Sequence, residues 1–278
     1  MKKMISLLLA AVMLMAVLAG CGSSDSGKKK LTVATSPDFA PMEFVSADEN
    51  AKGNDKYVGF DLTLAAYLAE NMGMELEIKP MSFDACQTAV EMGSVDLAIS
   101  GFSWTEERAE NFNLSDYYHA GDNEEEQIII TLAGNEGKYD TAEKLAGQKV
   151  GAQIASLQES LCKEQLPNST IVTVADLTTA IMQLRNGDFV ALAVAKGNGS
   201  AIIANNPDII ESGFYFEVDE KYTGNVIMMK KGNDDLTKKV NELLAKAESE
   251  GLYGPWYEQA KATAGIEVSF DENGNAAS

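Results

Sequence analysis

Short apolar runs alternate with amphipathic stretches along most of this chain, and this alternation constrains the fold more than any single motif does. The apolar runs predict buried strands, and the stretches between them repeat their apolar residues at helical spacing. Strands that alternate with helices are typical of α/β units with a mostly parallel sheet. The expected strands are 31–35, 75–79, 95–99, 128–130, 149–152, 171–174, 190–194 and 224–229, and the expected helices are 60–72, 83–92, 105–110, 141–145, 156–165, 177–186 and 234–250.

The order of these elements predicts a two-lobed fold with a ligand cleft between the lobes, because one series of strands and helices is followed by a second. We expect residues 31–127 and 222–265 to form lobe 1, residues 128–221 to form lobe 2, and the polar residues 266–278 to be a loose tail. In such folds ligands bind at the carboxyl ends of strands. The loop that follows Ile99 is therefore the candidate site.

Residues 1–20 have the features of a bacterial lipoprotein signal peptide. Two lysines precede an apolar run of about 15 residues, which is too short to span a bilayer stably. The sequence Leu18-Ala19-Gly20-Cys21 follows, so Cys21 is expected to carry acyl chains such as palmitate. Residues 21–30 would then be a flexible linker to a lipid anchor on the outer face of the cytoplasmic membrane. The alternatives are an ordinary signal peptide with a chance cysteine and an uncleaved membrane anchor.

Composition excludes several classes of function. The net charge is -20, and removal of the two leader lysines makes it -22, which argues against nucleic acid as a partner. The cysteines beyond the leader, Cys86 and Cys162, form no recognisable zinc site with the single histidine, His119. No Ser-His-Asp or Cys-His signature with a usable context is present. We therefore expect neither a metal nor a cofactor.

The segment Ser100–Arg108 combines features that suit a carboxylate ligand. Gly101 permits a close backbone approach, Ser103 provides a hydroxyl at the head of a helix, and Arg108 lies one turn into that helix. Free N–H groups at a helix start attract anions, and a guanidinium binds both carboxylate oxygens at once. The alternative is a surface helix in which Thr105 is the N-cap and Arg108 pairs with a glutamate of its own helix.

Several motifs together resemble those of one protein family. From Leu31 to Gln259 the chain resembles the extracellular solute-binding proteins, family 3, of polar amino acid ABC transporters. The matching segments are Phe39-Ala40-Pro41-Met42-Glu43-Phe44, Val58-Gly59-Phe60-Asp61-Leu62, Gly93-Ser94-Val95-Asp96-Leu97, Ser100 to Arg108, Leu114-Ser115-Asp116-Tyr117-Tyr118 and Lys149-Val150-Gly151-Ala152-Gln153. The resemblance implies a two-lobed periplasmic-binding-protein fold and a receptor function.

The resemblance also implies roles for individual residues. Arg108 would bind the ligand carboxylate, and Ser156 would contribute a second contact to it from lobe 2. The Gly101 carbonyl and the Ser103 hydroxyl would bind the α-ammonium group.

Four aromatic residues are further candidates for the site. By the resemblance Phe39 and Phe60 would form walls of the side-chain pocket, although either could instead be a core residue. Phe102 and Trp104 could provide a platform for the ligand, and Trp104 is equally compatible with the core.

The chain departs from the family at the position that binds the ammonium group. Ala195 lies where the family usually has an aspartate, and Val190 replaces a second one. A buried ammonium without an anionic partner costs several kcal/mol. Either another acid, such as Glu43 or Asp219, takes over this role, or the ligand is a carboxylate without an amine, such as an aromatic acid.

These observations predict a lipid-anchored, monomeric receptor that binds a small carboxylate solute, in the first place an amino acid, and delivers it to an ABC permease. We expect no enzymatic activity. The alternative is a dehydratase-like enzyme on the same fold, for which His119 and Glu43 are the candidate general acids.

Overall fold

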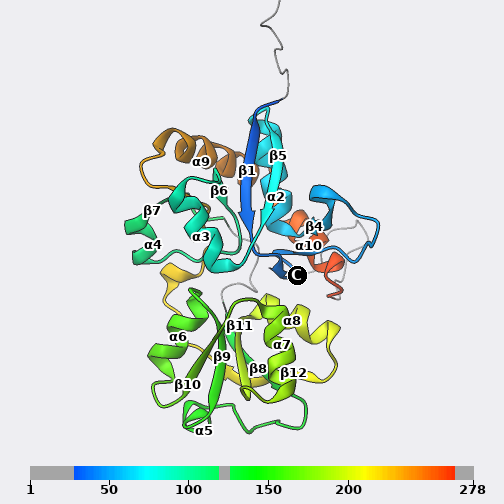
Figure 1. The fold of residues 1–278 in the computed structure, drawn as a ribbon, viewed down its shortest axis with the longest axis vertical. Helices are drawn as coiled ribbons and strands as arrows, with labels where there is room; N and C mark the ends of the chain where they lie inside the picture. Colours follow the sequence, from blue (N-terminus) through cyan, green and yellow to red (C-terminus); the bar gives the residue numbers. More distant parts are fainter. Residues whose placement is uncertain (1–27, 119–125, 267–278) are drawn as a thin grey trace, which may run out of the picture.

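The computed structural model describes residues 28–118 and 126–266 of the 278-residue chain. These residues form two lobes, which lie one above the other in Figure 1, and each lobe contains a five-stranded sheet with helices packed on it. The predicted signal peptide, Cys21, His119 and residues 267–278 of the predicted tail lie outside the described residues. Within the described ranges, no helix has both the length and the apolar character that a membrane crossing requires.

The sheet of the upper lobe in Figure 1 has the strand order β5-β1-β6-β13-β7. Its strands are β1 (Lys30–Thr35), β5 (Glu75–Pro80), β6 (Leu97–Ala98), β7 (Phe112–Leu114) and β13 (Met228–Lys230). Strand β1 is parallel to β5 and β6, whereas β13 is antiparallel to β6 and β7. Strand β13 therefore brings a late segment of the chain back into the first sheet.

The sheet of the lower lobe has the order β10-β9-β11-β8-β12. Its strands are β8 (Gln127–Leu132), β9 (Lys149–Gln153), β10 (Thr170–Val174), β11 (Ala191–Ala195) and β12 (Ile209–Tyr215). Strands β9, β10 and β11 are parallel neighbours, and β8 is antiparallel to β11 and β12. Gln127, expected at the end of lobe 1, begins β8 and pairs with Ala195, so it belongs to this second sheet.

Helices cover both faces of each sheet. On the first sheet, α2 (Phe60–Asn71), α9 (Asp234–Ser249) and α10 (Tyr253–Thr263) pack on one face and α3 (Phe83–Met92) on the other. On the second sheet, α5 (Ala142–Leu145) and α6 (Leu157–Gln165) pack on one face, and α7 (Leu177–Asn186) and α8 (Lys196–Asn205) on the other. The remaining elements are α4 (Glu106–Asn111), the small sheet β2 (Asp38–Phe39), β3 (Glu43–Val45) and β4 (Tyr57–Val58), and the 3-10 helices η1 (Gly53–Lys56) and η3 (Glu220–Tyr222).

The local sequence explains where these helices begin and end. Helix α7 begins after Asp176, whose carboxylate accepts a hydrogen bond from the Thr179 N–H. Helix α3 ends at Gly93, which has φ 71°, a left-handed conformation that glycine adopts without a Cβ penalty. The bounds predicted for these two helices agree with the structure.

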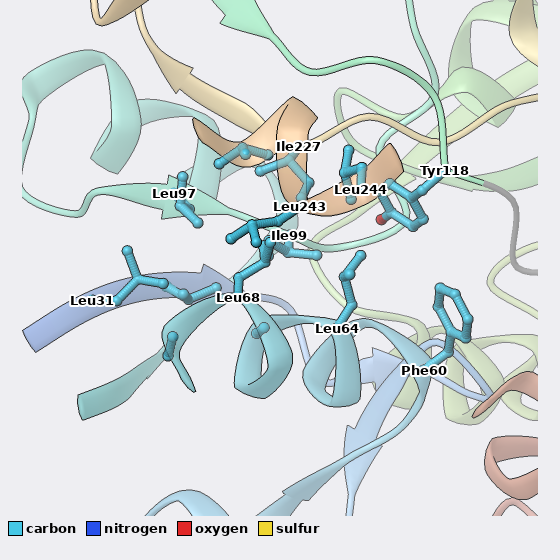
Figure 2. Close-up of a cluster of buried hydrophobic side chains, with 14 of the residues drawn as sticks. Leu31, Phe60, Leu64, Leu68, Leu97, Ile99, Tyr118, Ile227, Leu243 and Leu244 are labelled. Carbon is cyan, nitrogen blue, oxygen red and sulfur yellow. The ribbon is translucent and has the colours of Figure 1, made fainter. Parts of the chain in front are cut away.

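Alternation along the strands divides each lobe into two apolar cores. In β8, Ile129 points to the core beneath α6, whereas Ile128 and Ile130 point to the core beneath α7. In the upper lobe, Figure 2 shows leucines from β1, α2, β6 and α9 packed together, and Leu64 and Leu68 of α2 are fully buried there. Each such leucine contributes about 1.5–3 kcal/mol through burial. These cores make each lobe a firm support for the loops at its edge.

The chain passes between the lobes twice, once between β7 and β8 and once between β12 and β13. The two crossover segments meet where Tyr118 and Asn225 form an antiparallel bridge. The Tyr118 N–H donates to the Asn225 carbonyl at 2.9 Å. This bridge joins the two crossover segments to each other between the lobes.

Candidate functional site

The loop that follows β6 leads directly into the cleft between the lobes. Gly101 has φ 55°, and a Cβ atom at this position would lie 2.9 Å from Cε1 of Phe39. Both observations require glycine, because other residues rarely adopt this conformation and would collide with the ring. The loop therefore lies directly against Phe39, as the close approach inferred from the sequence suggests.

Helix α4 starts at the end of this loop and places Arg108 in its first turn. Thr105 is the N-cap, and its hydroxyl accepts a hydrogen bond from the Arg108 N–H. The guanidinium carbon of Arg108 lies 5.6 Å from the ring centre of Phe83 and 5.2 Å from that of Phe102. Two aromatic rings therefore support the guanidinium and fix its direction.

Arg108 is a buried cation with no anionic partner among the described residues. Its residue exposure is 5%, and no carboxylate in residues 28–118 or 126–266 lies within 4.0 Å of its guanidinium. Burial lowers the pKa of Arg108 to about 10, and the charge of nearby Glu107 opposes this effect. The ion pair with a glutamate of its own helix, which the alternative interpretation required, is not formed.

The hydrogen bonds of Arg108 go to main-chain carbonyl oxygens on both sides of the cleft. Its Nη1 donates to the Ser103 carbonyl at 2.6 Å, and its Nη2 donates to the Ala155 carbonyl of the lower lobe at 2.8 Å. A guanidinium has five N–H donors. These two bonds leave three donors for a ligand, and an anion would remove the cost of burying the unpaired charge.

A cavity next to Arg108 is lined by both lobes. Its enclosed volume is about 20 Å³, which is enough for roughly one water molecule. Its lining combines one guanidinium with aromatic, hydroxyl and amide side chains, one leucine and one glycine: Phe39, Phe83, Ser100, Gly101, Ser103, Arg108, Gln153, Ser156, Leu157 and Gln158. Five of these were candidates from the sequence, namely Phe39, Gly101, Ser103, Arg108 and Ser156.

The two serines differ in how far their hydroxyl groups are already used. Ser156 is the N-cap of α6, and its Oγ accepts from the Glu159 N–H and donates to the Gln153 carbonyl at 2.7 Å. The Ser103 hydroxyl makes no hydrogen bond within the described residues. Ser103 therefore offers a ligand both a donor and an acceptor, whereas the Ser156 hydroxyl has its donor committed.

Three expected pocket residues do not line this cavity. Phe60 is fully buried in the core of the upper lobe, where Figure 2 shows it near Tyr118 and their ring centres are 6.0 Å apart. Phe102 is fully buried 4.5 Å from Phe83 and lies beneath Arg108. Trp104 is half-buried and packs on the apolar core around α3. Phe60 therefore belongs to the core, Phe102 supports the guanidinium of Arg108 from beneath, and Trp104 packs against the core around α3.

Five lining residues were not assigned a role from the sequence: Phe83, Ser100, Gln153, Leu157 and Gln158. Phe83 begins α3, Gln153 ends β9, and Gln158 lies in the first turn of α6. The position of Gln153 was a usable signal, because it is at the carboxyl end of a parallel strand. Phe83 gave no such signal, since an aromatic residue at a helix start is equally compatible with the core.

Direct hydrogen bonds between the lobes close the cleft. Oδ2 of Asp38 accepts from the Leu177 N–H at 2.7 Å and from Nε2 of Gln153 at 3.1 Å. Nδ2 of Asn198 donates to the Ala40 carbonyl at 3.0 Å. Burial raises the pKa of the Asp38 carboxyl, and its hydrogen bonds oppose this effect. With the bond from Arg108, these contacts tie the upper lobe to β9, α7 and α8.

The expected substitutes for the ammonium-binding aspartate are not in the cavity. Ala195 is buried at the end of β11 and pairs with Gln127, which accepts a hydrogen bond from Gln158. Glu43 is fully buried behind Ser100, and Asp219 is an exposed residue that caps η3. Among the residues that the structure describes, none with a carboxylate side chain lines this cavity.

Metal binding and disulfide chemistry have no support in the described part of the chain. No group of three or more His, Cys, Asp or Glu side chains there could hold a metal ion. Cys86 and Cys162 are buried free thiols, and burial raises the pKa of Cys162 to about 12. Neither thiol is therefore a reactive thiolate at neutral pH.

Comparison with known proteins gives a consistent set of relatives. The arginine-binding extracellular protein ArtP of Bacillus subtilis is 31% identical over 261 residues, which cover 90% of this chain and 94% of ArtP. The glutamine-binding protein GlnH of the same organism is 28% identical over 276 residues, covering 93% of this chain and 97% of GlnH.

A solved structure agrees with these sequence relatives. The amino acid ABC transporter substrate-binding protein AbpA of Streptococcus pneumoniae, solved with bound L-arginine, is 32% identical with a TM-score of 0.78, and the match covers 86% of this chain and 97% of AbpA. Residues 31–260 match the family described as bacterial extracellular solute-binding proteins, family 3. The fold, the cleft and the motifs are those of this family, and the chain belongs to it.

Proposed function

We propose that this protein is a receptor that binds a small carboxylate solute of the amino acid class in the cleft between its lobes. The observation that carries the proposal is Arg108, a buried guanidinium with donors to spare and no carboxylate partner among the described residues. A buried unpaired cation is costly, so a site retains one where a ligand supplies the anion. Relatives that bind arginine and glutamine support the same class of ligand.

In the proposed complex the ligand carboxylate binds the free N–H groups of Arg108. The rings of Phe83 and Phe102 hold the guanidinium in place, which reduces the entropy lost on binding. The Ser103 hydroxyl and the Gly101 carbonyl face the α-substituent, and Gln153 and Gln158 add neutral polar groups from the lower lobe. An α-ammonium group would then bind neutral oxygens.

We further propose that Cys21 carries a lipid anchor, that the receptor acts as a monomer outside the cytoplasmic membrane, and that it delivers its solute to an ABC permease. The leader sequence and the family support this placement. No bond of the solute is made or broken, since the relatives named above are binding proteins. A solute incubated with the protein should therefore be recovered unchanged by NMR.

The test is a thermal-shift screen of residues 22–278 against the L-amino acids and their amine-free analogues. A ligand at 100 times its Kd stabilises the folded state by about 2.7 kcal/mol, which gives a clear rise in melting temperature. A rise with any member of either set supports the receptor function. If no member of either set raises the melting temperature, the proposal is wrong.

A further inference from the structure

Two carboxyl groups lie fully buried directly behind the binding loop. Glu43 of β3 and Asp61 of α2 both have 0% exposure. Their backbones are adjacent, because the Asp61 N–H donates to the Met42 carbonyl at 2.9 Å. No lysine or arginine of the described residues lies within 4.0 Å of either carboxyl group. Two buried acids without a cation demand an explanation, since burial of a single carboxylate is already unfavourable.

The two carboxyl groups hold the loop and the crossover at three points. Oε1 of Glu43 accepts from the Ser100 hydroxyl at 2.6 Å. Oδ2 of Asp61 accepts from the Gly101 N–H at 2.7 Å and from the Tyr118 hydroxyl at 3.0 Å. Ser100 and Gly101 line the ligand cavity, and Tyr118 lies in the bridge between the crossover segments. The pair therefore connects the loop that lines the cavity to the bridge between the crossover segments.

The remaining oxygens of the pair indicate a shared proton. Oε2 of Glu43 and Oδ1 of Asp61 are buried and find no donor within the described residues, although the two side chains are close enough to hydrogen-bond each other. Two carboxylates cannot make that bond, whereas a carboxylic acid and a carboxylate can. One proton on Oε2 of Glu43, directed at Oδ1 of Asp61, satisfies both atoms.

The surroundings favour one proton on the pair. Burial and the charge of Asp61 raise the pKa of Glu43 well above its ordinary value, and burial raises the pKa of Asp61 to about 6. The other titratable groups that face the pair are Asp38, Cys86 and Tyr118, and none of them supplies a positive charge. The two pKa shifts belong to the pair as a unit, because the pKa of each group depends on whether the other group is protonated.

We propose that Glu43 and Asp61 share one proton at neutral pH and act as positioning residues that hold Ser100 and Gly101 in the ligand-binding arrangement. The effect on binding rests on the receptor function proposed above, whereas the shared proton does not. Loss of the proton would place two negative charges side by side and would release the loop.

The shared proton can be tested without any ligand. Glu43→Gln keeps an acceptor toward Ser100 and an N–H donor toward Asp61, but it cannot titrate. Glu91→Gln, on the exposed surface of α3, is the matched control. We expect wild type and the control to show the infrared C=O band of a protonated carboxyl group at neutral pH, and Glu43→Gln to lack it. An unchanged band in Glu43→Gln would overturn the proposal.

Thermal unfolding between about pH 5 and pH 9 gives a second readout. A carboxyl group whose folded pKa is raised contributes stability at low pH, and this contribution is lost as the pH rises through the folded value. The melting temperature of wild type should therefore fall with rising pH relative to that of Glu43→Gln. Parallel curves for the two proteins would contradict the shared proton.

The positioning role is tested with the amino acid that gives the largest thermal shift, titrated by calorimetry. Glu43→Gln should bind with a Kd within about threefold of wild type, and Glu43→Leu, which removes the acceptor for Ser100 and leaves Oδ1 of Asp61 without a donor, should bind at least about tenfold more weakly. If Glu43→Leu does not fold, Asp61→Asn is used in its place. The amide N–H of the new side chain would donate to Glu43, so Glu43 would no longer need a proton. The infrared band of the protonated carboxyl group should then vanish while ligand binding persists. Equal binding by Glu43→Leu and wild type, or persistence of the band in Asp61→Asn, would refute the positioning pair. Failure of every ligand in the screen would instead reject the receptor function.

Discussion

Arg108→Met is the substitution that most directly examines the proposed carboxylate site. Methionine has a similar length and packs well against aromatic rings, so it can occupy the space next to Phe83 and Phe102. It removes the guanidinium that we expect to bind the ligand through two hydrogen bonds. A hydrogen bond to a charged group contributes about 1.5–3 kcal/mol, so the loss of two is about 3–6 kcal/mol. At about 1.4 kcal/mol per tenfold change, the Kd should rise by about 10² to 10⁴.

Arg108→Met should change the stability of the folded protein much less than it changes ligand binding, because one stabilising and one destabilising contribution oppose each other. The variant loses the bonds from Arg108 to the carbonyls of Ser103 and Ala155, but it also removes a buried charge that has no anionic partner among the described residues. We expect the melting temperature of the ligand-free protein to stay within about 4 °C of wild type, which corresponds to about 1 kcal/mol for a chain of this size.

Arg185→Met is the matched control for this experiment. Arg185 lies on α7, is partly exposed and pairs with Asp208 far from the cavity. Calorimetric titration should give this variant the affinity of wild type. If Arg108→Met binds the same ligand with a Kd within threefold of wild type, the carboxylate assignment is wrong.

Two further substitutions examine other parts of the site. Asp38→Ala removes the acceptor for the Leu177 N–H and for Gln153, so the closed form should be less populated. Ligand binding should weaken by about tenfold, and small-angle scattering should show a larger radius of gyration for the ligand-free protein. An unchanged radius and affinity would exclude this closing role. Ala195→Asp should raise the affinity for an α-amino acid, relative to that for its amine-free analogue, by about tenfold or more. The ligand-free protein should be less stable than wild type, because the new carboxylate is buried. An unchanged affinity ratio, measured by parallel titrations, would show that residue 195 does not face the ligand nitrogen.

Strong local signals were sufficient to predict the regular elements. Helix α7 has an N-cap at Asp176, apolar residues at helical spacing and a glycine at its end, so its sequence alone defines its bounds. Strands β9 and β10 are compact apolar runs between polar turns, and the structure places them within one residue of their predicted bounds. In these elements local propensity and tertiary packing favour the same conformation.

The elements that were not predicted depend on tertiary contacts. Helix α8 contains two glycines, which lower its intrinsic helix propensity. Gly199 is required there by packing, since a Cβ atom would lie 2.8 Å from Cδ1 of Ile128. Strand β7 has three residues and exists through its pairing with β13. Strand β13 itself is shorter than predicted, because residues 225–227 belong to the crossover.

In the candidate site, too, local sequence signals were readable and tertiary contacts were not. The loop from Ser100 to Arg108 was recognisable because glycine, hydroxyl groups and a cation follow one another over a short stretch. Asp38 and Gln153 meet across the cleft, and their separation in sequence gives no signal of that contact. Phe60 and Phe39 both looked like pocket aromatics, and the packing of Tyr118, Trp256 and Tyr257 around Phe60 placed it in the core.

The bond from Arg108 to the carbonyl of Ala155 joins the proposed ligand-binding cation of the upper lobe to the lower lobe. With the contacts of Asp38 and Asn198, it favours the closed over the open arrangement of the two lobes. A solute shifts this equilibrium only by the difference between its affinities for the closed and open states.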